Sequence, residues 1–169
     1  HVDDFSAIGN GAGTFQHVLE KLNYLKNLGI NAIELMPISE FPGIHSWGYD
    51  PQIISAINGN YGTPTQFKYF VDQCHANGIA VIIDIIWNHI RSSSPLWKMQ
   101  PDYNLNPYIK HHEEMNQNEA PGSWGMLDID HFNSYTIEYI NKVHRIYVDE
   151  YKIDGFRFDA AAHLGWSTS

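Results

Sequence analysis

The feature that most constrains the fold is a repeated alternation of amphipathic helical segments and short apolar runs. Apolar residues recur at helical spacing in three segments, and a strand-like run follows each segment within a few residues. These pairs occupy residues 14–27 and 31–37, 63–78 and 79–84, and 134–150 and 153–159. Because helices between strands bring those strands side by side in one direction, the sequence predicts an α/β fold with a parallel sheet.

Individual residues sharpen these boundaries. Pro64 suits the first turn of the second helix, and Gly29 and Gly78 mark the ends of the first two helices. Cys74 is the only cysteine, which excludes an intrachain disulfide, and its position in a helical segment predicts a buried structural thiol. Residues 1–5 are interpreted as the end of a further strand.

Residues 91–125 interrupt the alternation. The stretch is rich in Ser, Pro, Asn, His and Tyr, and it shows no sustained period. A segment of this length without regular elements is typically a functional loop or a small subdomain. We therefore interpret residues 1–169 as one domain that carries an irregular insertion at about 91–125.

Charge and hydropathy argue against several classes of partner. The formal net charge is −9 and no cluster of Lys and Arg occurs, whereas nucleic-acid binding depends on such clusters. No apolar run is long enough to span a bilayer, and no secretory segment opens the chain. We expect no nucleic acid, no membrane association, and a cytoplasmic rather than a secreted location. The chain begins abruptly, so a leader ahead of it would change the last expectation.

Two polar stretches resemble ligand motifs but lack the required spacing. In the glycine-rich residues 9–14, Thr14 stands where a dinucleotide loop needs its third glycine, and the lysine of a P-loop is missing. We expect a loop that leads into a helix cap. The residues 111–114 (HHEE) are adjacent, and adjacent side chains do not converge on one ion, so we expect a solvated loop there.

Polar side chains gather where the three predicted strands end. They are Glu34 in the first, Asp84 with Asn88 and His89 in the second, and Arg157 and Asp159 in the third. A (β/α)8 barrel and an open doubly wound sheet both place their sites at this edge. The pattern therefore predicts a site there and leaves both architectures open.

Three segments carry the most specific chemistry, namely 47–51 (WGYDP), 84–89 (DIIWNH) and 155–163 (GFRFDAAAH). Each alone has a structural explanation. Tyr49 could fill the core, Asp84 could bind a loop, and Arg157 with Asp159 could form a buried ion pair. All three in this order, at the ends of successive strands, favour a functional site instead.

These segments resemble the motifs of the α-amylase family of glycoside hydrolases. The family's D-x-x-x-N-H motif at barrel strand three is matched by residues 84–89, and its G-F-R-x-D-x-x-x-H motif at strand four by residues 155–163. The resemblance covers essentially the whole chain, and residues 29–43 and 61–89 are most like 1,4-alpha-glucan (glycogen) branching enzymes and trehalose-releasing relatives. It implies a partial (β/α)8 TIM barrel, about strands one to four, with a short insertion after strand three.

The resemblance also implies roles at the reacting bond. Asp159 would be the nucleophile, and Arg157, on the same face of the strand, would keep it ionised and oriented. Tyr49 would stack on the sugar and His89 would donate to its hydroxyls. Asp84 would hold the geometry of the site rather than react.

Three further residues receive roles at the margin of the site. His163 would line a neighbouring subsite, and Trp47 is grouped with the substrate-binding residues. Asn88 corresponds to a calcium ligand in many family members. Calcium at Asn88 is the only cofactor that the resemblance suggests. Because branching-type relatives often dispense with that ion, we expect no cofactor.

Part of the family's catalytic set has no counterpart in the sequence. Retaining hydrolysis uses two carboxyl groups about 5–5.5 Å apart, yet the general acid/base glutamate of strand five and the second aspartate of strand seven are missing. The spacing of Glu34 and Glu40 recommends neither as a substitute. We expect the chain on its own to be inactive, and its unpaired strand edges to favour self-association.

The sequence thus favours a retaining domain of the branching-enzyme type that acts on α-glucans or maltooligosaccharides. Plain α-amylase hydrolysis and maltooligosyl trehalose hydrolysis are the alternatives within the family. A non-catalytic glucan-binding module and a nucleotide-binding α/β protein are alternatives from other classes. The last of these predicts thermal stabilisation by nucleotides, which we do not expect.

Overall fold

The computed structural model describes residues 1–7, 12–111 and 125–164, so parts of the glycine-rich stretch 9–14 and of the stretch 111–114 lie outside the described residues. The elements of the first half are α1 (Val2–Ser6), α2 (Phe15–Glu20), α3 (Leu22–Asn27), β1 (Ala32–Leu35), β2 (Ser39–Glu40), β3 (Ile53–Ile57), α4 (Pro64–Ala76) and β4 (Ala80–Ile85). Those of the second half are β5 (His89–Ile90), α5 (Pro95–Lys98), β6 (Ile109–Lys110), β7 (Leu127–Ile129), α6 (Ser134–Arg145), the π-helical turn η1 (Ile146–Glu150), β8 (Gly155–Phe158) and the 3-10 turn η2 (Ala161–His163).

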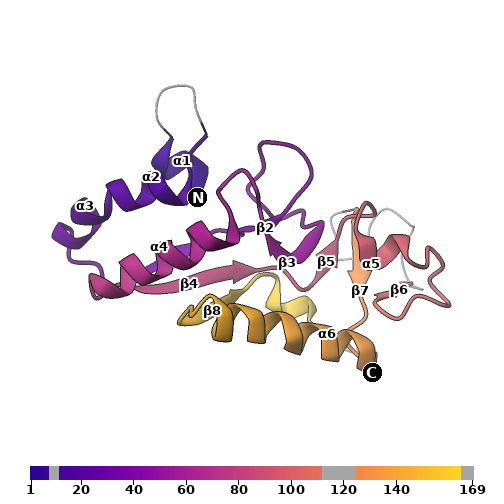
Figure 1. The fold of residues 1–169 in the computed structure, drawn as a ribbon. Coiled ribbons are helices and arrows are strands. Elements are labelled where there is room, and N and C mark those ends of the chain that lie inside the picture. The colour runs from indigo at the N-terminus through magenta and orange to yellow at the C-terminus, as the bar shows by residue number, and fades with distance from the viewer. Residues whose placement is uncertain (8–11, 112–124, 165–169) are drawn as a thin grey trace.

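The main sheet has three parallel strands in the order β1-β4-β8. Of these, β4 and β8 are labelled side by side in Figure 1. The central strand β4 aligns Ile83 with Leu35 of β1 and with Phe156 of β8. Its alternate residues Val81, Ile83 and Ile85 are fully buried, in a core shared with apolar residues of α4 and η1. The predicted α/β fold with a parallel sheet is confirmed, and all three predicted helix-then-strand pairs contribute to it.

The opposite face of this sheet is less covered. Ala32 and Glu34 of β1 are exposed there, and Ile82 of β4 is only half-buried. The apolar run 79–84 is typical of a strand covered on both faces, whereas the described residues bury one face fully. Strand alternation directs Val81 and Ile83 to the face covered by helices and Ile82 to the opposite face.

Local chemistry explains where the helices begin. The Thr63 side chain accepts a hydrogen bond from the backbone N–H of Gln66, whose side chain accepts one from the N–H of Thr63, so a capping box starts α4. Thr14 caps α2 by accepting from the N–H of His17, as the expected helix cap requires. The helical segment 14–27 is divided at Lys21 into α2 and α3.

The interpretation of residues 1–5 as a strand is wrong, because they form the short helix α1. The backbone N–H of Asp4 donates to the ring of His1, and the Ser6 hydroxyl donates to the Val2 carbonyl at 2.6 Å. Asp3 and Asp4 lie in the first turn, where acidic side chains favour a helix. Among the described residues the parallel sheet therefore has three strands instead of about four.

Two small antiparallel sheets complete the described fold. One pairs β2 with β3, and the second has the order β5-β7-β6. The second sheet begins at β5, shortly after β4 (Figure 1). Its strand β6 and the helix α5 lie within the predicted insertion, and β5 and β7 flank the insertion on either side. Residues 112–124 of that insertion lie outside the described residues.

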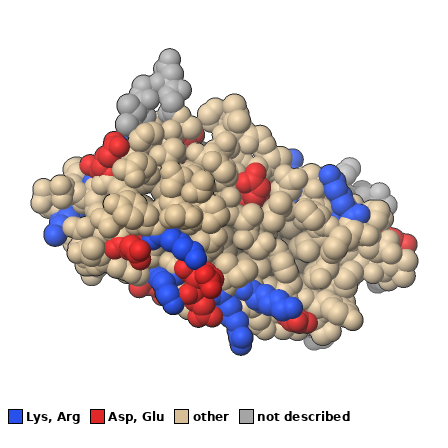
Figure 2. All heavy atoms as spheres, in the orientation of Figure 1, with Lys and Arg blue, Asp and Glu red and all other residues tan. Residues whose placement is uncertain are grey.

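Cys74 is fully buried, as predicted. On the face drawn in Figure 2, Lys and Arg side chains alternate with Asp and Glu along the lower edge, and pairs such as Lys68 with Glu150 join opposite charges. In the described part of the chain, no helix is both long and apolar enough to cross a bilayer.

Candidate active site

The carboxyl ends of β4 and β8 bring two predicted site residues together. Asp84 and Arg157 are register partners on these neighbouring strands. Nη1 of Arg157 lies 2.9 Å from each carboxylate oxygen of Asp84. The Asp84 side chain is buried, and this burial raises the pKa of its carboxyl although hydrogen bonds from Arg157 and Tyr49 act in the opposite direction.

Arg157 also holds Asp159, the predicted nucleophile. The same Nη1 donates to Oδ1 of Asp159 at 2.5 Å. The hydrogen bond to Asp84, with a smaller contribution from Asp159, raises the pKa of the guanidinium above its already high value, so Arg157 stays charged. The N–H of Asp159 donates to the carbonyl of Ile85 at 3.1 Å, and Ala160 then takes a left-handed conformation with φ +47° that ends the strand.

Tyr49 reaches Asp84 from the loop between β2 and β3. Its hydroxyl donates to Oδ2 of Asp84 at 2.9 Å, and burial together with this bond raises the pKa of Tyr49 to about 12. The loop approaches the segment between β1 and β2 at Gly48, which has φ +86° and where a Cβ would lie 2.6 Å from the carbonyl oxygen of Pro37. A glycine is therefore required at position 48 for this loop path.

His89 supports the same loop. Its side chain is almost fully buried in β5, with Nε2 2.8 Å from the carbonyl oxygen of Tyr49 and Nδ1 3.2 Å from the side-chain nitrogen of Asn88. A carbonyl accepts only, so the Nε2 facing it carries the proton. The predicted contact of His89 with a sugar hydroxyl would require release of this bond to Tyr49.

A second ion pair, between Asp50 of this loop and Arg91 after β5, was not indicated by the motifs. Nη2 of Arg91 donates to Oδ2 of Asp50 at 2.8 Å, and the N–H of Arg91 donates to the carbonyl of Pro51 at 2.9 Å. The Ser46 hydroxyl donates to the other oxygen of Asp50. The available signal was an acidic residue inside WGYDP and a basic residue two positions after His89.

Trp47 and His163 do not take part in these hydrogen bonds. Trp47 is 66% exposed and lines a cavity of about 400 Å3 with His1, Asp3, Asp4, His45 and Ser46. His163 is exposed on η2, four residues after Asp159. The substrate-binding roles of both residues stay predictions.

The calcium candidate gains no support from its surroundings. Calcium takes about six to eight oxygen ligands. The side-chain nitrogen of buried Asn88 faces His89, and the described residues bring together no group of three His, Cys, Asp or Glu side chains that could hold a metal ion. We derive no step of the chemistry through calcium.

Comparisons with known proteins agree with this geometry. The family model "Alpha amylase, catalytic domain" matches residues 4–127. The chain is 35% identical over 162 residues to the malto-oligosyltrehalose trehalohydrolase of Saccharolobus solfataricus, covering 95% of this chain and 26% of that protein. It is 33% identical over 147 residues to the 1,4-alpha-glucan branching enzyme GlgB of Halothermothrix orenii, covering 86% and 22%. The structure of an Anoxybacillus alpha-amylase, 28% identical, matches with a TM-score of 0.78 over 97% of this chain and 36% of that one.

The chain matches only part of the length of these relatives. It spans about a quarter of the length of the curated relatives given above. Its structural neighbours are TIM barrels, of which it covers about a quarter to a third. The prediction of a partial (β/α)8 barrel is confirmed.

Proposed function

Because the chain belongs to the alpha-amylase catalytic-domain family of glycoside hydrolases, we propose that it carries the nucleophile side of a retaining site for α-glucans. The observation that supports this most is the contact of Arg157 with both Asp84 and Asp159 at the carboxyl ends of adjacent strands. Barrel enzymes place their chemistry at this end of the sheet.

In the proposed reaction the Asp159 carboxylate attacks the anomeric carbon of a glucose unit. The bond from that carbon to the leaving oxygen breaks, the oxygen takes a proton from a general acid, and a covalent glycosyl ester remains on Asp159. Water or a sugar hydroxyl then attacks the same carbon, gives its proton to the group that acted as the acid, and releases the Asp159 carboxylate. The two inversions together retain the configuration of the anomeric carbon. Arg157 binds Oδ1 of Asp159, which leaves Oδ2 as the attacking oxygen.

Asp84 acts in this scheme as a positioning residue. Its two oxygens receive Arg157 and Tyr49, so the carboxylate fixes both side chains relative to Asp159. With both oxygens occupied, Asp84 is not placed to protonate a leaving group. The general acid is therefore a group other than those in this cluster, and we expect no turnover by the chain alone when the leaving oxygen needs a proton.

The reaction type is a finer part of the proposal. The phrases around β1 and β4 resemble both branching enzymes and trehalose-releasing relatives, and we keep a branching-type transfer, in which a sugar hydroxyl accepts the glycosyl group, as the first candidate. Trehalose release is the second candidate, because several of the similar relatives are malto-oligosyltrehalose trehalohydrolases, at 31–36% identity, against 33% for a branching enzyme. Amylose and maltooligosyltrehalose, tested in parallel, separate the two reactions. Branching transfer introduces new branch points into amylose, whereas trehalose release frees trehalose from maltooligosyltrehalose.

The test is turnover of α-maltosyl fluoride, whose fluoride leaves without a proton, by the chain and by its Asp159→Asn variant. Loss of the nucleophile should lower kcat by more than about a thousandfold. Asp72→Asn, on the exposed face of α4, is the matched control and should leave kcat unchanged. Turnover that survives Asp159→Asn would contradict the proposal, and glucan binding without turnover by either protein would favour the non-catalytic binding module.

A further inference from the structure

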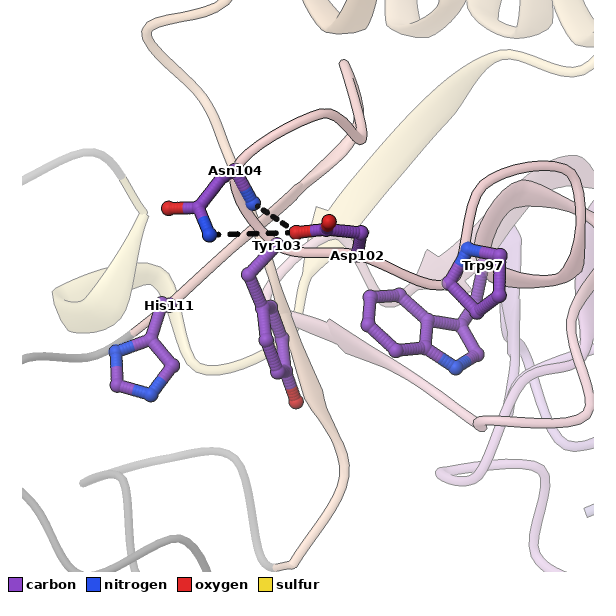
Figure 3. A pocket seen from close by; sticks show the side chains of 6 residues that line it. Trp97, Asp102, Tyr103, Asn104 and His111 are labelled. Carbon is purple, nitrogen blue, oxygen red and sulfur yellow. Dashed lines mark hydrogen bonds between the residues drawn. The ribbon is translucent and has the colours of Figure 1, made fainter.

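We propose that the inserted segment carries a second sugar-binding site, around Trp97 and Tyr103, that takes a chain of α-1,4-linked glucose. The inference rests on the proposed α-glucan function and extends it to residues outside the Asp159 cluster. The site is a cavity of about 470 Å3, lined by Trp97, Pro101, Asp102, Tyr103, Asn104 and His111 (Figure 3). Pockets for small ligands measure about 300–1,000 Å3, so this cavity is large enough for a short stretch of sugar units.

Two aromatic rings supply the apolar part of the site. The centroids of Trp97 and Tyr103 are 4.7 Å apart, with ring planes inclined by 43°. Tyr103 lies between Trp97 and His111, and the His111 ring meets it edge-on at 5.1 Å (Figure 3). A glucose ring presents C–H groups on its faces, which pack on such aromatic surfaces while its hydroxyls stay hydrated or hydrogen-bonded.

The polar side chains at the rim of the cavity can accept hydrogen bonds from sugar hydroxyls. Oδ1 of Asp102 accepts from the backbone N–H of Asn104 at 2.9 Å and from its side-chain nitrogen at 3.3 Å. These bonds fix the Asp102 carboxylate and leave Oδ2 to accept from a ligand. The side-chain oxygen of Asn104 points away from Asp102 in Figure 3, so it is a further acceptor.

The charge of the lining favours a neutral polyol over an anion. Asp102 is acidic, and no Lys or Arg is among the six lining residues. An anionic ligand such as a phosphate would meet Asp102 without a compensating cation. The combination of ring faces, a carboxylate and an amide is suited to an uncharged sugar.

The loop that carries these groups is held in place before any ligand arrives. The side-chain nitrogen of buried Asn106 donates to the carbonyls of Leu96 and Gln100 at 2.8 Å each. Its oxygen accepts from the backbone N–H groups of Tyr108 and Ile109 at 2.8 and 3.0 Å. A loop fixed in this way loses little further conformational entropy when it binds a ligand.

Packing alone does not account for the exposed rings. Trp97 contacts the core on one side, which anchors the site to the domain. Tyr103 in contrast is 38% exposed although it lines the cavity. A large aromatic side chain left at the wall of a cavity is typical of a binding site.

The experiment is a titration of the chain with maltoheptaose. Binding is measured by calorimetry and by the indole N–H signal of Trp97 in nuclear magnetic resonance spectra. We expect the Trp97 signal to shift and Tyr103→Ala to weaken binding about tenfold, which corresponds to about 1.4 kcal/mol. Tyr103→Phe keeps the ring and should retain most of the affinity. Tyr69→Ala removes a tyrosine exposed on α4 and should leave binding unchanged.

Two outcomes would overturn the second site. One is a Trp97 signal that does not respond to maltoheptaose, and the other is equal affinity of the Tyr103→Ala variant and the unaltered chain. The Asp159→Asn variant separates this proposal from the proposed reaction. It should lose turnover of α-maltosyl fluoride, which needs no general acid, while the response of Trp97 to maltoheptaose persists, so either proposal can fail without the other.

Discussion

The molecule contains two polar networks that are built in opposite ways. At the ends of β4 and β8, Asp84 joins Tyr49 and Arg157 through charged or ionisable side chains that come from three distant parts of the chain. In the inserted segment, Asn106 uses a neutral amide to bind four backbone groups, all of them within ten residues. The first network arranges side chains relative to one another, and the second determines the path of a loop.

This difference indicates that one network contributes to stability and the other to the proposed reaction. A buried amide with four backbone partners has no freedom to act on a ligand, so its contribution is stability of the segment. The Asp84 network ends in Arg157, whose side chain is 42% exposed, and in Asp159, which is 18% exposed. Those two side chains can meet a ligand, which is why we place the reaction there and assign a structural role to Asn106.

The largest effect on stability is expected at Asn106. Asn106→Ala leaves two carbonyls and two N–H groups of the loop without their partners, which should cost about 2–4 kcal/mol in the local free energy of unfolding. Hydrogen exchange at the amides of Tyr108 and Ile109 measures this directly. Asn104→Ala, an exposed position in the same loop, should change protection there by less than about 0.5 kcal/mol. Equal protection in the two variants would remove the contrast between the networks.

A smaller effect is expected at Asp84. Asp84→Ala removes the acceptor of Tyr49 and one partner of Arg157, and should cost about 1–3 kcal/mol, because the half-exposed Arg157 can turn to water. Urea unfolding measures the loss. Asp50→Ala, which breaks the more exposed pair with Arg91, should cost no more than about 1 kcal/mol and serves as the control. An Asp84 variant as stable as the Asp50 variant would show that the buried carboxylate does not organise the site.

The smallest effect concerns Trp87, the residue that links the main sheet to the insertion. Nε1 of Trp87 donates to Nε2 of His144 at 2.9 Å, and burial lowers the pKa of His144 below its ordinary value. The folded state thus binds fewer protons than the unfolded state, so this stabilisation is complete above about pH 6.5 and is lost as the pH falls through the folded pKa. His131, which contacts the Trp87 carbonyl, has a pKa lowered by burial as well.

The measurement for this contact is urea unfolding at pH 7.5 and at pH 5.5. The chain should be less stable at the lower pH, by at most about 1.4 kcal/mol per unit by which the pKa of His144 is lowered. His144→Gln should show a weaker dependence, with the part due to His131 remaining. An unchanged pH dependence in His144→Gln would show that the contact with Trp87 contributes nothing to it.

Much of the fold was predictable because its signals are local. The threonine-proline start of α4, the glycines that end α3 and α4, and the apolar runs of β1 and β4 are each read within a few residues. The meeting of Asp84 and Arg157 was also predictable, because parallel strands end at one edge and alternation directs both side chains to one face.

The parts of the fold and of the site that the sequence did not predict mostly depend on contacts between distant residues. The bond from Tyr49 to Asp84 requires the approach of Gly48 to Pro37, which nothing in the motif indicates. The strand β3 was not predicted, because five residues pairing with the two-residue strand β2 leave almost no periodic signal. Residues 1–5 were too few for a period to separate strand from helix, and there the ring of His1 and the acidic first turn favour the helix.

The central claim is that Asp159 is the nucleophile, and covalent labelling tests it most directly. A 5-fluoro-α-glucosyl fluoride loses fluoride without help from a general acid, and its ring fluorine slows hydrolysis of the ester, so the chain can be tested without a proton donor. Mass spectrometry of the digested protein should find one glycosyl group on the peptide that contains Asp159, and none in Asp159→Asn. A glycosyl group on Asp84, or one that persists in Asp159→Asn, would contradict the account.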